Sequence, residues 1–201
     1  MSVVTLVSGG IDSALMAIMA KEQGIRQFPL FVDYGQLSRK KEWAACKFIL
    51  KRHGLPTPTK MDLSGFGKVI ISGLTSKALD IKGEAFLPGR NLLFLLAGSS
   101  YAFQQGTDAV AIGFLNENVS LFPDQTSMFL EFAQRAIANA LGREIKILAP
   151  LMVFNKGDIL ELATQRQLSG TYSCHAGTEV PCKVCIACRE IFNASIPKGV
   201  L

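Results

Sequence analysis

The stretch Ser8-Gly9-Gly10-Ile11-Asp12-Ser13 joins an apolar run at residues 3–7, typical of a buried strand, to an apolar run at residues 14–20, typical of a helix. A glycine pair at such a junction lets the backbone turn tightly and approach an anion closely. The free N–H groups of the first helical turn and the helix dipole attract the same anion. The stretch therefore predicts a phosphate-binding loop whose contacts are Val7, Ser8, Gly9, Gly10, Ile11, Asp12 and Ser13.

The polar side chains of this loop suit the same purpose. Ser8 and Ser13 offer hydroxyl donors to phosphate, and Asp12 either caps the helix or holds a Mg²⁺ ion. A plain strand-to-helix turn is the alternative interpretation. The Gly-Lys-Ser/Thr ending of a Walker loop does not occur in the sequence, so that class of nucleoside triphosphatase is excluded.

The composition limits the class of protein. The chain has 201 residues, 49% apolar and 18% charged, which fits one globular domain with a small appendage. It has no apolar run of about eighteen residues and no secretory signal, which predicts a cytoplasmic protein without a membrane partner. A formal charge of +5 is too weak a bias to indicate direct nucleic-acid binding.

Strand-like and helix-like segments alternate along the chain. We expect strands at residues 3–7, 28–32, 60–63, 109–112 and 145–149, and helices at 12–23, 38–52, 91–105, 125–141 and 156–167. The glycine-interrupted residues 64–87 are expected to form a loop or lid. The alternation predicts an α/β fold with a doubly wound parallel sheet.

Ligands of such folds bind beyond the carboxyl ends of the strands. Asp33, Tyr34 and Gln36 follow the second expected strand, and Gly113 follows the fourth. We therefore expect Asp33, Tyr34 and Gly113 to contribute to the nucleotide site and Gln36 to contact the substrate.

Four cysteines form a second constellation, with the spacing Cys-x7-Cys-x2-Cys-x2-Cys. Four thiolates at close range suit a tetrahedral structural Zn²⁺ site. An iron–sulfur cluster is the alternative, although the fourth cysteine and proline of the ferredoxin run are missing. His175 is a competing ligand that four cysteines make unnecessary. We expect a nucleotide-binding domain at residues 1–170 and a zinc-binding loop segment at 171–201, with Cys174, Cys182, Cys185 and Cys188 as ligands.

The loop resembles the PP-loop of the ATP pyrophosphatase superfamily, whose fold is of the adenine nucleotide alpha hydrolase (HUP) type. Almost the whole chain resembles one family in it, the 7-cyano-7-deazaguanine synthases. The landmarks, besides the loop and the cysteines, are Asp33-Tyr34-Gly35-Gln36, Pro88-Gly89-Arg90-Asn91, Phe122-Pro123-Asp124, Ala149-Pro150-Leu151 with Lys156, and Arg189.

The resemblance implies an enzyme of queuosine biosynthesis. Members use ATP to convert 7-carboxy-7-deazaguanine and ammonia to the nitrile 7-cyano-7-deazaguanine, through adenylated intermediates. They are also similar in carrying a zinc ion bound by four cysteines, and they are usually homodimers. For this chain the resemblance implies ATP, Mg²⁺ and Zn²⁺ as cofactors.

The same resemblance suggests roles for individual residues. Asp12, Ser13, Arg90 and Lys156 are the expected catalytic residues. Gln36, Arg90, Asn91, Phe122 and Asp124 are the expected substrate contacts, with Asp124 at the guanine-like edge. The alternatives are structural: Asn91 and Asp124 as helix caps, and Lys156 as a solvated residue after an Asn155 cap.

The chain departs from the family where the substrate pocket is expected. Leu37-Ser38 stand in place of Arg-His, Phe122 stands in place of Tyr, and the acidic residue upstream is out of register. One alternative is a divergent relative that couples the adenylated deazaguanine to another amine, such as one on a protein acceptor in antiphage defence. A tRNA-thiolating enzyme and a non-catalytic nucleotide-binding scaffold are further alternatives.

Overall fold

The computed structural model of the chain describes residues 1–119 and 121–195. Its centre is a five-stranded parallel sheet with the strand order β3-β2-β1-β4-β5. The order reverses between β1 and β4, which confirms the predicted doubly wound sheet. The strands are β1 (Ser2–Leu6), β2 (Arg26–Asp33), β3 (Thr59–Asp62), β4 (Ala109–Ala111) and β5 (Lys146–Leu148).

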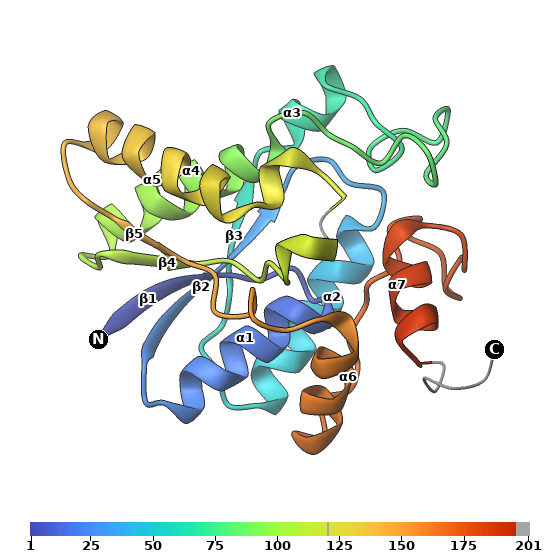
Figure 1. The fold of residues 1–201 in the computed structure, drawn as a ribbon, viewed down its shortest axis with the longest axis horizontal. Helices are drawn as coiled ribbons and strands as arrows, with labels where there is room; N and C mark the ends of the chain where they lie inside the picture. The colour runs from blue at the N-terminus through green and yellow to red at the C-terminus, as the bar shows by residue number, and fades with distance from the viewer. Residues whose placement is uncertain (120, 196–201) are drawn as a thin grey trace.

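Helices cover both faces of this sheet, α4 and α5 on one side and α1, α2 and α6 on the other (Figure 1). No helix among the described residues has the length and apolarity needed to cross a membrane. The helices are α1 (Ile11–Glu22), α2 (Arg39–Arg52), α3 (Ser64–Val69), α4 (Arg90–Gln104), α5 (Ser127–Leu141), α6 (Lys156–Gln165) and α7 (Ile186–Ser195), with short 3-10 turns at Glu117–Val119 and Pro123–Gln125.

The core follows from the alternation of side chains along the central strand. Val4 and Leu6 of β1 pack against the α4–α5 layer, whereas Val3 packs against α1 and α6. Because both faces of β1 are covered, the strand is almost continuously apolar, as expected for a central parallel strand. This burial fixes the end of β1, and therefore the start of the phosphate loop, within the molecule.

Three expectations about local structure need correction. Residues 64–87 contain a short helix, α3, in addition to turns. The cysteine segment, residues 171–201, is not only a loop, since α7 begins within it at Ile186. Residues 196–201 of this segment lie outside the described part of the chain. The helix expected from residue 125 starts at Ser127, and Thr126 caps it by accepting a hydrogen bond from the Phe129 N–H at 3.1 Å.

The loop between β1 and α1 depends on the absence of a side chain at Gly9. Gly9 has a φ of +83°, a conformation that L side chains rarely adopt. A Cβ atom added there would lie 2.3 Å from the Glu42 carbonyl oxygen and 2.8 Å from the Cys46 nitrogen, both in the backbone of α2. The loop and α2 can therefore touch only because residue 9 is glycine.

We predict that Gly9→Ala lowers the free energy of unfolding by roughly 2–5 kcal/mol, since it adds backbone strain to a steric overlap. Gly24→Ala is the matched control: Gly24 has a φ of +69° but no atom within 4 Å of an added Cβ. It should cost only about 1–2 kcal/mol. Urea denaturation measures both values, and equal losses would contradict the steric argument.

Candidate active site

The phosphate loop is held in shape by its own hydroxyl groups. The Ser8 N–H donates to Ser13 Oγ at 3.1 Å, and the Gly10 N–H donates to Ser8 Oγ at 3.3 Å. Gly10 is the N-cap of α1 and provides no side-chain cap, while Asp12 lies inside the first turn. The interpretation of Asp12 as a helix cap is therefore wrong. An uncapped, glycine-led helix start has N–H groups to offer an anion.

Lys156, the first residue of α6, reaches across to the loop. Its Nζ lies 2.7 and 2.8 Å from the two carboxylate oxygens of Asp12 and 3.7 Å from Glu190 Oε2. Burial raises the pKa of Glu190, and the charge of Lys156 opposes that shift. The predicted Asn155 cap is confirmed: a capping box with Asp158 fixes the start of α6. Lys156 follows this cap but is not a solvated surface residue, since its side chain is 13% exposed.

Two cavities meet at Lys156 and its ion-pair partners Asp12 and Glu190. The smaller cavity has a volume of about 190 Å³ and the larger one of about 600 Å³. Both lie at the carboxyl edge of the sheet, beside the phosphate loop. The residues that line both are Asp12, Leu121, Gln125, Lys156, Ile186 and Glu190.

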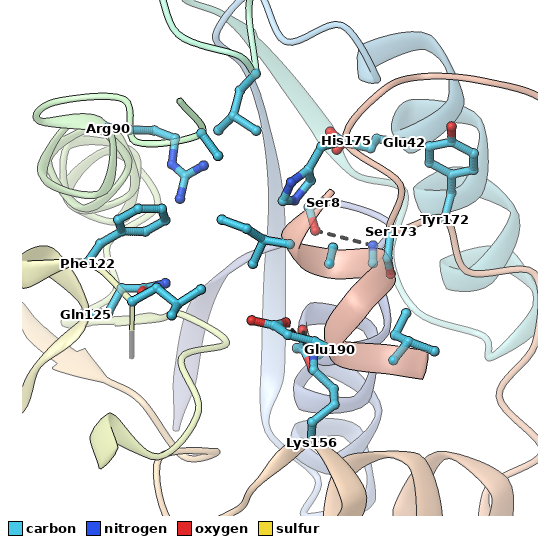
Figure 2. A pocket seen from close by; sticks show the side chains of 18 residues that line it. Ser8, Glu42, Arg90, Phe122, Gln125, Lys156, Tyr172, Ser173, His175 and Glu190 are labelled. Carbon is cyan, nitrogen blue, oxygen red and sulfur yellow. Dashed lines mark hydrogen bonds and ion pairs between the residues drawn. The ribbon is translucent and has the colours of Figure 1, made fainter. Parts of the chain in front are cut away.

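The smaller cavity brings several predicted residues together. Ser8 of the loop lies on one side, and Arg90 and Phe122 face it from the other (Figure 2). Gly10 of the loop also lines this cavity. The Arg90 guanidinium carbon stands 5.9 Å from the centre of the Tyr34 ring, a cation–π contact that helps to hold it. This cavity therefore combines loop N–H groups with a positioned guanidinium, a set suited to an anion.

Of three other predicted residues, one lines the larger cavity and two line neither cavity. Gly113 lines the larger cavity. Asp33 forms an ion pair with Lys60 at 2.8 Å. Gln36 is 2% exposed, and its Oε1 accepts a hydrogen bond from the Tyr34 N–H. These contacts give Asp33 and Gln36 roles in shaping the turn after β2.

Asn91 and Asp124 form a linked pair outside both cavity linings. The Asn91 side chain donates to the Asp124 carbonyl oxygen at 3.1 Å, so it ties α4 to the Pro123–Gln125 turn. Asn91 does not cap α4, because Gly89 is the N-cap. Asp124 Oδ1 is buried and has no hydrogen-bond partner among the described residues.

Several residues of the smaller cavity were not predicted from the sequence, among them Glu42, Glu190 and His175. Glu42 comes from α2, Glu190 comes from α7, and His175 was assigned no role. Burial, with Arg90 and Lys156 nearby, lowers the pKa of His175 to about 4, so this side chain is neutral at pH 7. No local pattern marks these residues, since each reaches the cavity through long-range packing.

The four cysteines converge as predicted. Their sulfur atoms all lie within 4.8 Å of one another, and Cys174 and Cys185 are buried. Burial alone would raise the pKa of Cys174, but hydrogen bonds from the Cys182 backbone and the Thr178 hydroxyl outweigh it and lower the pKa to about 6. Metal–sulfur bonds of about 2.3 Å in a tetrahedron would space the sulfurs by roughly 3.8 Å. The cluster therefore fits one tetrahedral metal ion.

This cysteine segment is attached directly to the phosphate loop. The Tyr172 N–H donates to the Gly9 carbonyl oxygen at 2.9 Å. A Cβ at Gly177 would lie 2.6 Å from the Leu37 carbonyl oxygen, so the segment also packs closely on the turn before α2. Lys41 and Glu179 form an ion pair across the same contact.

A parallel sheet with this strand order and a Ser-Gly-Gly-x-Asp-Ser loop at its switch point defines a PP-loop nucleotide-binding protein of the α/β class. Within that class, the family described as queuosine biosynthesis protein QueC matches residues 2–194. The chain belongs to this family.

Individual relatives agree with the assignment. The chain is 32% identical over 198 residues to the 7-cyano-7-deazaguanine synthase of Sulfurovum sp. (strain NBC37-1), with 92% of this chain and 89% of that protein covered. It is 34% identical to the synthase of the same name from Prochlorococcus marinus (strain AS9601), with 98% and 94% covered.

Solved structures with the same fold are more distant. The U34-tRNA thiolase NcsA from Methanococcus maripaludis, solved with its [4Fe-4S] cluster, superposes with a TM-score of 0.59 at 16% identity; the match covers 88% of this chain and 61% of that one. NMN synthetase from Francisella tularensis gives 0.53 at 15% identity, covering 89% and 68%. At these identities the likeness concerns the fold alone.

We predict that the purified protein carries a metal ion that Cys185→Ser removes, because the cluster then loses a buried thiolate. Elemental analysis by mass spectrometry measures the metal content. Cys46→Ala is the matched control, since Cys46 is buried in the core away from the cluster and should leave the metal content unchanged. Equal metal content in Cys185→Ser and the unaltered protein would contradict the assignment.

Proposed function

We propose that the protein is an ATP-dependent carbon–nitrogen ligase that converts 7-carboxy-7-deazaguanine and ammonia to 7-cyano-7-deazaguanine. The observation that carries the proposal is the phosphate loop with Lys156 beside it, at the meeting point of two cavities. The names of the relatives supply the substrate. Ammonia as the nitrogen donor and a homodimeric assembly are predictions of the family resemblance.

In the first step, a carboxylate oxygen of the substrate attacks the α-phosphorus of ATP. The bond to the bridging oxygen breaks, and pyrophosphate leaves with the electron pair. Backbone N–H groups of the loop and the hydroxyls of Ser8 and Ser13 hold this diphosphate. Arg90 and Lys156 stabilise the negative charge that grows on it as it leaves. The product is an acyl adenylate.

Lys156 and Asp12 exchange partners in this step. An arriving phosphate competes with Asp12 for the Lys156 ammonium, which it now contacts at 2.7 Å. The freed Asp12 carboxylate is the residue that would hold Mg²⁺, and a bound Mg²⁺ would supply further charge neutralisation. Glu190 keeps Lys156 near the loop during the exchange.

Nitrogen enters in the second step. Ammonia attacks the acyl carbon and AMP leaves with the former carboxylate oxygen, so that an amide forms after loss of a proton. The amide oxygen then attacks a second ATP and releases pyrophosphate. Loss of AMP and of both protons of the amide nitrogen leaves the nitrile. The same loop serves both activations, and no protein nucleophile is needed.

The cysteine cluster is proposed to hold Zn²⁺. A cubane of four irons separates its thiolates more widely than a single ion does, whereas these sulfurs all lie within 4.8 Å of one another. The ion would have a structural role: Cys174, Cys182, Cys185 and Cys188 would fix the segment that bonds Gly9 and carries Glu190.

We predict that the protein forms the nitrile from the acid, ATP and ammonium, with AMP and pyrophosphate as coproducts, as detected by mass spectrometry. Lys156→Met should lower kcat by about 10²–10³-fold, because it removes a charge at the leaving phosphate. Lys146→Met on the exposed edge of β5 is the matched control and should keep full activity.

Two outcomes would overturn the proposal. The first is an amide, or a conjugate with a protein amine, that accumulates while no nitrile appears. The second is the absence of pyrophosphate release with this acid, which would leave a nucleotide-binding scaffold.

A further inference from the structure

Glu42 is a buried acidic residue that the proposed chemistry does not use. It is 9% exposed and lines the smaller cavity. Its two carboxylate oxygens accept hydrogen bonds from Ser38 Oγ at 2.7 Å and from Gln36 Nε2 at 2.9 Å. Within the described part of the chain, no lysine or arginine lies at ion-pair distance from it. Among residues 1–119 and 121–195, both hydrogen-bond donors to this carboxylate are neutral.

Such a group has unused binding capacity. A carboxylate offers about four lone-pair positions, and the two hydrogen bonds to Glu42 fill only half of them. A buried charge with neutral partners is costly unless further donors complete its shell. The cavity is the direction from which such donors can come, which points to a ligand that presents N–H groups.

A second unpartnered polar atom lies on the same wall. His175 Nδ1 is buried without a hydrogen-bond partner among the described residues. Figure 2 shows His175 and Glu42 together on one side of the smaller cavity, with Arg90 and Phe122 facing them. Phe122 is itself supported by Phe86, at a ring-centroid distance of 5.2 Å. The cavity thus has a polar wall with unused hydrogen-bonding capacity and an aromatic side chain, Phe122, on the wall opposite.

We propose that Glu42 is the specificity-determining residue for the acceptor and accepts hydrogen bonds from the ring N–H and exocyclic amino group of a 2-amino-pyrimidinone edge. This assignment rests on the proposed function and refines it. Bases are commonly recognised by hydrogen bonds to this edge together with aromatic stacking. Phe122 supplies the stacking surface, and a nitrogen of His175 faces the neighbouring carbonyl group.

The orientation suits the reaction. In a 7-deazaguanine the carboxylate at position 7 stands on the five-membered ring, away from the amino edge. With the amino edge at Glu42, this carboxylate points away from Glu42 along the cavity toward Lys156, which lines the same space at its other end (Figure 2). Glu42 therefore takes the role that the sequence analysis gave to Asp124, which lines neither cavity.

The test compares two acids, 7-carboxy-7-deazaguanine and its analogue without the 2-amino group. The unaltered protein should prefer the amino form by about 10- to 100-fold in kcat/KM, as expected for a hydrogen bond to a charged group. Glu42→Gln should reduce this preference to within about threefold while leaving the KM for ATP unchanged. The amide keeps the size of the side chain and still bonds Gln36 or Ser38.

Ser38→Ala is the matched control. It removes a hydrogen bond to the same carboxylate but leaves its charge, so the preference for the amino form should persist even where stability falls. A preference retained in Glu42→Gln, or a raised KM for ATP in place of the acid, would overturn the assignment. Calorimetric titration of both acids without nucleotide gives the same comparison if no nitrile forms, so failure of the reaction and failure of the Glu42 assignment are distinguishable.

Discussion

The close approach of α2 to the phosphate loop is the constraint on which the site depends. It is possible only because Gly9 has no side chain, since a Cβ would overlap the Glu42 carbonyl oxygen. The same contact places the Glu42 side chain in the cavity wall next to the loop. On its other side, Gly9 accepts a hydrogen bond from Tyr172 and so secures the cysteine segment. One residue thus aligns the loop, the acidic wall and the segment that carries Glu190.

Two acidic side chains balance the charge of Lys156 and so stabilise the site without a bound ligand. The positive charge of a lysine that is only 13% exposed needs nearby negative charges, and Asp12 of α1 and Glu190 of α7 provide them. In the proposed first step, phosphate takes the place of Asp12 beside Lys156, so the buried ammonium group keeps an anionic partner. Because Glu190 belongs to the cysteine segment, the position of this compensating charge depends on the metal cluster. In the proposed function, a metal ion bound by the cysteines would therefore be linked to the reacting phosphates through the Glu190 side chain.

Features fixed by local spacing could be predicted from the sequence. The loop, the alternation of strands and helices, the four-cysteine cluster and the Asn155 cap all follow from neighbouring residues. Features fixed by long-range contacts could not. α7 was not predicted, because the metal-ligand spacing of the cysteines favoured a loop over the same residues. Glu42 reads as one acid in a basic, solvated helix, and only its packing against Gly9 brings it to the cavity.

Two of the departures expected from the family resemblance, Ser38 and Phe122, lie at or beside the smaller cavity: Phe122 lines it, and Ser38 is hydrogen-bonded to Glu42. Ser38 stands at the N-cap of α2 yet makes no capping hydrogen bond, a use of the side chain that forgoes about 1 kcal/mol of helix stability. Its hydroxyl instead donates a hydrogen bond to Glu42 at 2.7 Å. The phosphate loop, Lys156 and the cysteines keep the family pattern. In the proposed function, the loop and Lys156 would keep the chemistry of activation, and the wall around Glu42 would determine how the acceptor is held.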